Sequence, residues 1–234
     1  MVVRILALCF AVVLSGCAAT ALQPEVASSI RQNKVAVAAY VEDKKINYSE
    51  MVYKVLWNET HSQTAAFEGL WDVDRDLTDL LTEELRQVGV DGYPVTSVLV
   101  DEDYGKFVEA IRTAQNQEGR KVPVALSEEI RNELYSSGFK YLILLRSSGL
   151  HVQTTSMFSM AQLNMPVFLI VSDLESNSEK YNESFWLMRN IDFEESVREI
   201  EDDNLAQVRE TVASWMTEMM QGHFPTMFGA SSKQ

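Results

Sequence analysis

Cysteine is nearly absent from this sequence. The 234-residue chain has two cysteines, Cys9 and Cys17, and both lie within its first 17 residues. The rest of the chain therefore offers no thiol for a disulfide, a thiolate metal site or a cysteine nucleophile. Any folded domain built from it must be stabilised by its hydrophobic core alone.

Basic residues are also scarce. The sequence has 20 Lys and Arg against 34 Asp and Glu, which gives a net charge of −14. A chain this acidic lacks the broad basic surface that nucleic acids and anionic headgroups require, so we expect no nucleic-acid partner. The hydrophobic content of 46% with 23% charged residues is typical of a globular protein.

The common signatures of enzymes and cofactor sites are missing as well. The sequence contains no GxSxG, P-loop, GxGxxG or CxxC motif. The three histidines lie far apart and form neither an HxH nor an HExxH spacing: His61, His151 and His223. We therefore predict that the protein is not an enzyme and that it binds no cofactor and no metal.

One acidic cluster resembles a calcium loop only in part. Asp72, Asp74 and Asp76, with Glu83, match its start and end, but Leu77 stands where the loop needs glycine. The same acids suit the first turn of a helix, because carboxylates interact favourably with the positive end of the helix dipole. We interpret residues 72–88 as an amphipathic helix with Asp72 as its N-cap.

Long apolar runs are absent except at the start of the chain. Residues 5–14 are continuously apolar and follow Arg4. Ten residues are too few for a transmembrane helix, which needs about 20. The length fits the apolar region of a cleaved secretory signal, which small residues follow at the cleavage site.

The residues that follow this run add a more specific feature. Leu14, Ser15, Gly16 and Cys17 resemble the lipobox of bacterial lipoproteins, in which leucine, a small residue and glycine or alanine precede cysteine. The resemblance implies cleavage between Gly16 and Cys17, and lipidation of Cys17. The alternative is a plain cleaved signal with a cysteine at its boundary. Two or more acyl chains would anchor the protein firmly, since each buried methylene contributes about 0.8 kcal/mol.

The residue after the cysteine indicates which of the two bacterial membranes would carry the anchor. Many Gram-negative lipoproteins that stay in the inner membrane carry aspartate there, whereas this chain has Ala18. The resemblance therefore implies anchoring in the outer membrane. We expect the protein to face the periplasm, with exposure at the cell surface as the alternative.

The interior of the chain contains one unusual stretch. Residues 147–172 include no Asp, Glu, Lys or Arg, and methionines gather in their middle. Flexible thioether side chains suit adaptable binding surfaces, and exposed apolar patches mark partner sites. We predict a surface for self-association or partner contact; the alternative is a segment packed into the core. Its residues are Met157, Phe158, Met160, Leu163 and Met165.

Hydrophobic periodicity predicts alternating strands and helices. A polar run at 173–180 between two apolar segments indicates a hairpin. The pattern predicts an α/β fold, or α+β sandwich, in which helices pack on one mixed sheet in a single domain. Strands are expected at 35–41, 51–57, 93–100, 139–145, 167–171 and 181–188, and helices at 72–88, 104–111, 127–138 and 202–222.

The order of elements is similar to that of a known group. An apolar strand, an acidic-capped helix and a further strand after a lipobox resemble the curli-export lipoproteins and the related amino-terminal domain of the Tol-system β-propeller protein. The resemblance covers residues 35–100. The phenylalanine-centred turn often found after the first strand of that group is replaced here by Val41, Glu42 and Asp43.

These observations predict a domain order and a function. We expect a signal peptide at 1–16, a flexible tether at 17–33, a globular domain at 34–228 and a disordered tail at 229–234. The predicted protein is an outer-membrane lipoprotein that acts as a non-enzymatic accessory module in envelope assembly or export. Its expected partners are the membrane, through the lipid, other envelope proteins and further copies of itself.

Two other functions remain as alternatives. The first is a ring- or pore-forming secretion component in which residues 152–172 form a membrane hairpin. Transmembrane strands need about 9–11 residues each, and Pro166 interrupts this stretch. The second, which ranks last, is a hydrolase that uses His151 or paired acids.

Overall fold

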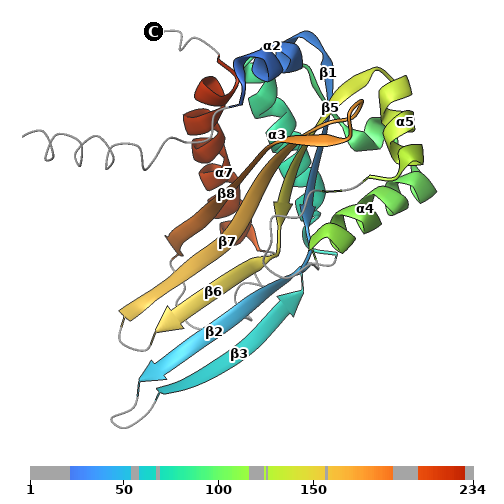
Figure 1. The fold of residues 1–234 in the computed structure, drawn as a ribbon. Helices are drawn as coiled ribbons and strands as arrows, with labels where there is room; N and C mark the ends of the chain where they lie inside the picture. Colours follow the sequence, from blue (N-terminus) through green and yellow to red (C-terminus); the bar gives the residue numbers. More distant parts are fainter. Residues whose placement is uncertain are drawn as a thin grey trace, which may run out of the picture.

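A mixed sheet of eight strands forms the centre of the molecule, and five α-helices of the described part of the chain pack on it (Figure 1). The computed structural model describes residues 22–53, 58–66, 69–115, 124, 126–155, 158–191 and 205–229. The predicted α+β class, with a mixed sheet and packed helices in one domain, is confirmed. The strands are β1 (Lys34–Val41), β2 (Lys45–Tyr53), β3 (Asn58–Ala66), β4 (Gly92–Pro94), β5 (Phe139–Ser147), β6 (Leu150–Thr155), β7 (Phe158–Asp173) and β8 (Ser178–Ile191). The helices are α2 (Pro24–Gln32), α3 (Val73–Gln87), α4 (Asp101–Gln115), α5 (Glu128–Ser136) and α7 (Ala206–Met227), with a short 3₁₀ turn η1 (Val95–Ser97).

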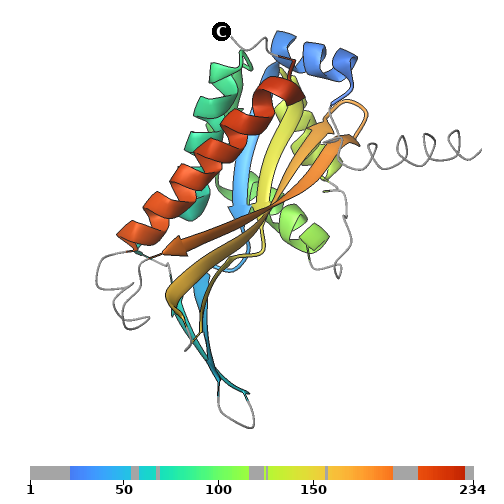
Figure 2. The same ribbon diagram turned by 90° about the vertical axis from the view of Figure 1, so that its left-hand side faces the viewer.

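The sheet has two parts that share β7 and β8. In the first part, which we call the body, β1 pairs in parallel with β4 and β5, and β5 pairs antiparallel with residues 167–173 of β7. In the second part, the arm, β2 pairs with β3 and β6, and β6 pairs with residues 158–164 of β7. Strand β8 follows β7 through both parts. The arm extends away from the helices (Figures 1 and 2).

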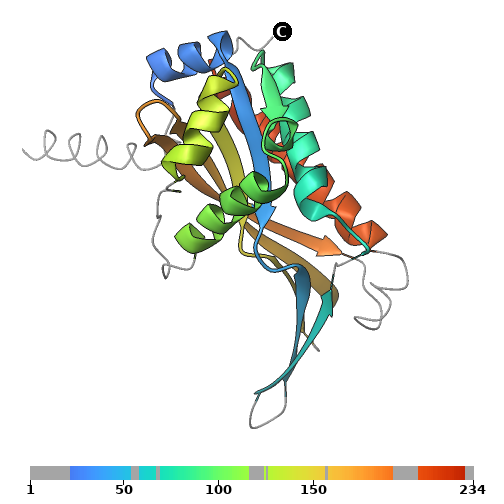
Figure 3. The ribbon, with the colours of Figure 1, turned by 90° about the vertical axis from the view of Figure 1, so that its right-hand side faces the viewer.

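The helices cover the two faces of the body separately. Helices α2, α3 and α7 lie on one face, and α4 and α5 lie on the other (Figures 2 and 3). Strand β1 is buried on both faces, as its continuous apolar sequence predicts: Val35, Val37 and Ala39 join one core, and Ala36, Ala38 and Tyr40 join the other.

Helix α3 also completes the hydrogen bonding of β1. Because β4 pairs only with residues 35–37, the amides of Ala39 and Val41 lack a strand partner on that side. Ala39 N donates to Thr78 Oγ1 at 2.8 Å, and Val41 N donates to Asp74 Oδ1 at 2.8 Å. Two side chains of α3 thus replace a missing strand, since unpaired buried amides are costly.

The predicted helix boundaries at α3 and α5 are confirmed. Asp72 Oδ1 accepts from Arg75 N at 3.3 Å, and Ser127 Oγ accepts from Ile130 N at 3.3 Å. Gly89 and Gly138 follow these two helices with φ of +80° and +91°. Such left-handed residues are the usual ends of helices, and glycine adopts them without strain.

The expected tether is shorter than the sequence suggested. Residues 24–32, which we expected to be flexible, form α2, and Ala27 and Ile30 are buried. Pro24 occupies the first turn, where its missing amide costs nothing. The small and polar composition concealed a narrow apolar stripe, which the body covers.

Two other boundaries were also wrong. Helix α7 continues through Gly222 and Pro225 to Met227, because its apolar stripe extends to Phe224 and Met227 and these side chains are buried. The predicted strand at 93–100 is reduced to β4, because Pro94 has no amide with which to continue the ladder and a 3₁₀ turn follows.

Replacing Ile30 by Ala tests whether α2 belongs to the folded body. The side chain is 0% exposed, so we expect the substitution to lower the free energy of unfolding by about 2–4 kcal/mol in chemical denaturation. The exposed Gln32→Ala on the same helix serves as the control. Equal stability of both variants and the parent would show that α2 is only a linker.

Candidate functional site

The structure separates the predicted interaction residues. The predicted lipidation and cleavage residues, Gly16 and Cys17, lie outside the described residues, as does Met157. Phe158 and Met160 belong to β7, but their side chains are not among those described. Leu163 and Met165 are 0% exposed and lie in the core, so these two side chains are not part of a surface.

The position of the histidines argues against a shared site. His61 is exposed on β3, and His151 is exposed on β6. The His223 ring on α7 packs edge-to-face on Phe185, with 4.8 Å between the centres of the two rings. The part of the chain that the structure describes contains no group of three or more His, Cys, Asp or Glu that could hold a metal ion. Among the same residues, no helix has the length and apolar character needed to cross a membrane.

The acids at the start of α3 have structural partners. Asp72 caps the helix. Asp74 accepts from Val41 N and pairs with Lys44. Asp76 Oδ2 accepts from Trp71 Nε1 at 2.9 Å and from Arg209 Nη2 at 3.2 Å. Their interpretation as the first turn of a helix is confirmed.

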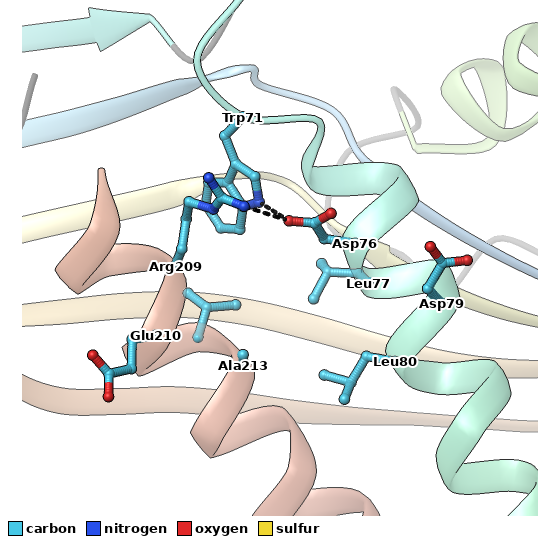
Figure 4. Close-up of a pocket in the computed structure, with 9 residues that line it drawn as sticks. Trp71, Asp76, Leu77, Asp79, Leu80, Arg209, Glu210 and Ala213 are labelled. Atoms are coloured by element: carbon cyan, nitrogen blue, oxygen red, sulfur yellow. Dashed lines mark hydrogen bonds and ion pairs between the residues drawn. The ribbon is translucent and has the colours of Figure 1, made fainter. Parts of the chain in front are cut away.

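A groove lies between α3 and α7 (Figure 4). It has a volume of about 440 Å³, and Leu77, Leu80 and Val212 supply its apolar lining. The Asp76 carboxylate joins Trp71 and Arg209 at one end (Figure 4). Since this carboxylate is already bound twice, the groove suits an apolar group of a partner better than acid–base chemistry.

One cation is buried where the body meets the arm. Arg146 on β5 is 4% exposed, and its guanidinium lies 5.4 Å from the centre of the Phe168 ring. Its Nε and Nη1 atoms have no hydrogen-bond partner among the described residues. Burial lowers the pKa of Arg146, but an arginine remains charged at neutral pH. The ring contact only partly offsets this desolvation.

The arm presents one face with very few charged side chains. This face continues to Phe168 and Ser184 of the body, and we call it the neutral face. The register places its side chains opposite those that enter the core: Gln153 pairs with Gln162 on one face, while Val152 pairs with Leu163 on the other. All the described side chains of the neutral face are partly or fully exposed. The described members are Asn47, Ser49, Met51, Thr60, Ser62, Thr64, His151, Gln153, Gln162, Asn164, Pro166, Phe168, Ser184, Trp186, Met188 and Asn190.

Two large side chains stand out on the neutral face. Trp186 is 64% exposed and Met188 is 53% exposed, and both come from β8. Trp186 lies across from Pro166, and Met188 lies across from Asn164. Sequence reasoning had placed residues 181–188 in a strand but missed this surface. Its local signal is the alternation of Ser184, Trp186, Met188 and Asn190 with the core residues of β8.

Comparisons with known proteins leave the family open. No family model and no curated protein matches the chain. Among solved structures, protein XCC0632 from Xanthomonas campestris is 8% identical, with coverage of 84% of each chain and a TM-score of 0.39. Lipoprotein GNA1162 from Neisseria meningitidis is 8% identical over 78% of this chain and 99% of its own, with a TM-score of 0.37. Hypothetical protein CT253 from Chlamydia trachomatis is 13% identical over 79% of this chain and 95% of its own, with a TM-score of 0.38. At such scores these likenesses assign no function to the chain.

Replacing Arg146 by Met should stabilise the protein or leave its stability unchanged. An apolar side chain of similar volume removes a desolvated charge, and such replacements of buried ionic groups often gain about 1–4 kcal/mol. Urea denaturation would measure the change, with the exposed Arg112→Met as the control. A loss of about 3–5 kcal/mol would show instead that the guanidinium has a partner that stabilises it.

Asp74 should give the stability a defined pH dependence. Burial raises the pKa of Asp74, although Lys44 and the Val41 amide act in the opposite direction. The folded carboxylate therefore binds its proton more tightly than the unfolded one, and its ionisation opposes folding at neutral pH. This penalty disappears as the pH falls through the raised pKa of Asp74 towards 3.8, the ordinary pKa of an aspartate.

The wild-type chain should thus gain stability relative to Asp74→Asn as the pH is lowered from about 7 to about 4. Paired denaturation curves at several pH values would measure this difference. A difference that shrinks on acidification would mean that the Lys44 ion pair outweighs burial.

Proposed function

We propose that the chain is an outer-membrane lipoprotein whose folded domain acts as a non-enzymatic interaction module in the periplasm. One observation carries the proposal: the first described residues and the arm lie at opposite ends of the molecule (Figures 1 and 3). Leu22 is 4% exposed and packs in the same core as Ile30 of α2. A lipid on Cys17 would therefore hold the α2 end at the membrane and direct the arm away from it.

The distance between anchor and body is short. Leu22 is the fifth residue after Cys17, and five residue steps span at most about 18 Å. The α2 end of the body would then remain close to the bilayer surface, and the arm would reach into the periplasm. An anchored domain meets partners in this layer at effective concentrations in the millimolar range.

The chemistry of the described residues supports binding over catalysis. Asp74 and Asp76 of α3 are used in structural hydrogen bonds, and Asp79, which also lines the groove, forms an ion pair with Arg75. The arm, in contrast, offers an exposed face from five strands that the described helices do not cover (Figure 2). A broad exposed sheet face is suited to recognition.

Lipidation tests the first part of the proposal. In growing bacteria fed radioactive palmitate, the natural chain should incorporate label and sediment with the outer membrane. Cys17→Ala should lose both properties, because the thiol that carries the lipid is gone. Cys9→Ala is the matched control, since the other cysteine lies inside the predicted signal, and it should behave like the natural chain. Equal labelling of the natural chain and Cys17→Ala, or none in either, would refute the anchor.

A further inference from the structure

The neutral face is unusual for this protein. It comprises sixteen described side chains, and at the 23% of charged residues found in the whole chain roughly four of them would be charged. None is. Two cations lie on the same side of the sheet at the end nearest to the body: the exposed Lys45 at the start of β2, and the buried Arg146, which pairs with Phe168. The composition therefore differs from that of an ordinary solvent-exposed surface, on which charged residues are concentrated.

We infer that the neutral face binds an uncharged glycan chain. This inference specifies the partner of the arm and rests on the proposed function for its access to the periplasm. Amide and hydroxyl groups both donate and accept hydrogen bonds. Sugar hydroxyl and acetamido groups do the same, so the two surfaces match without any ionic partner. The amide side chains of the face come from β2, β6, β7 and β8: Asn47, Gln153, Gln162, Asn164 and Asn190.

Trp186 supplies the apolar part of the match. Trp186 is 64% exposed, across from Pro166 and diagonal to Asn164 of β7. An aromatic ring offers a flat apolar surface and an N–H donor at one edge. The C–H face of a sugar ring can stack on such a surface while its hydroxyl groups reach the neighbouring amides. Exposure of this ring is then explained by its ligand.

The chemistry of the face disfavours other partners. Charged polymers need complementary charge, which the described side chains of the face do not provide. A lipid surface needs a contiguous apolar patch, whereas most of these side chains are amides and hydroxyls. Protein interfaces are enriched in aromatic residues, methionine and arginine and are depleted in serine. The sixteen residues include two aromatic residues and two methionines, but also three serines and no arginine, and ten of them are amides or hydroxyls, which does not match that composition.

Direct binding measurements test the inference. The purified full-length chain in detergent is titrated with chitohexaose and maltohexaose, two neutral oligosaccharides, and with an acidic galacturonate hexamer. Calorimetry and tryptophan fluorescence report binding. We expect at least one neutral oligosaccharide to bind, the acidic one to bind more weakly, and Trp186→Ala to reduce the affinity by about tenfold or more, as the loss of one good contact predicts.

Matched variants distinguish the face from general effects. Gln153 and Gln162 lie opposite each other, and Gln153→Glu with Gln162→Glu adds charge while it keeps the shape. This double variant should also lose about tenfold or more in affinity. Gln63→Glu places a charge on the other face of the same arm, beside Tyr48, and should change the affinity less than about twofold. Tyr135→Ala removes an exposed aromatic ring from α5 and should have equally little effect.

Several outcomes would overturn the inference. The inference is wrong if neither neutral oligosaccharide binds or if the acidic hexamer binds more tightly than they do. It is also wrong if the variants of the neutral face bind with the same affinity as the parent. Sedimentation that shows a dimer dissociated by Trp186→Ala would assign the face to a second copy instead. Cys17→Ala should keep the full affinity for the oligosaccharide, so failure of the lipid anchor and failure of glycan binding are separate results.

Discussion

The alternation of side chains along β7 determines where the rest of the sheet can lie. Leu163, Met165 and Val167 enter the core on one face, and Gln162 and Asn164 point to the opposite face. A shift of one residue in pairing would bury the amides and expose the apolar side chains, so the register is strongly fixed. Strands β5, β6 and β8 all pair with β7. The register of β7 therefore determines which side chains of the body and the arm face the core and which face away from it.

The body becomes the arm where two neighbouring strands break at the same level. Residues 42–44 separate β1 from β2, and residues 148–149 separate β5 from β6. Glu42 N donates to Ser147 O at 2.9 Å and Asp43 N donates to Ser148 O at 3.2 Å, which holds the two breaks together. Gly149 has φ of +142°, and a side chain there would lie 3.0 Å from the Cβ atom of Asp43. Glycine permits this close approach.

Local sequence patterns predicted much of the fold, whereas features that depend on the pairing of distant strands could not be predicted. The apolar stripe and the N-cap of α3 are encoded within one short segment, so the sequence predicted a helix at 72–88 with Asp72 as its N-cap, and both ends agree with the structure. The strand β3 was missed because only Ala65 among its described side chains is buried, which leaves no apolar alternation to detect. The methionine-rich stretch was read as one surface, but its period of two divides it between the core and the neutral face. The neutral face could not be predicted as a unit, because it combines residues from five strands whose order in the sheet differs from their order in the chain.

An exposed sheet with few charged side chains can pair with other chains. A purely structural role of the arm does not explain why this risk is retained. Natural proteins place charged residues, lysine above all, on exposed edge strands to prevent pairing with other chains, and β3 is the edge strand of the arm. This chain has acidic residues in abundance, yet the described side chains of the neutral face include none, whereas Glu50 and Glu59 occur on the other face of the same arm. Replacing Thr60, Ser62 or Gln153 by a charged residue would leave the core untouched, because all three are exposed. Stability therefore does not require these positions to be neutral. A ligand that is itself uncharged and rich in hydrogen-bonding groups gives a reason for it, because each charge left unpaired beneath such a ligand would have to lose its water.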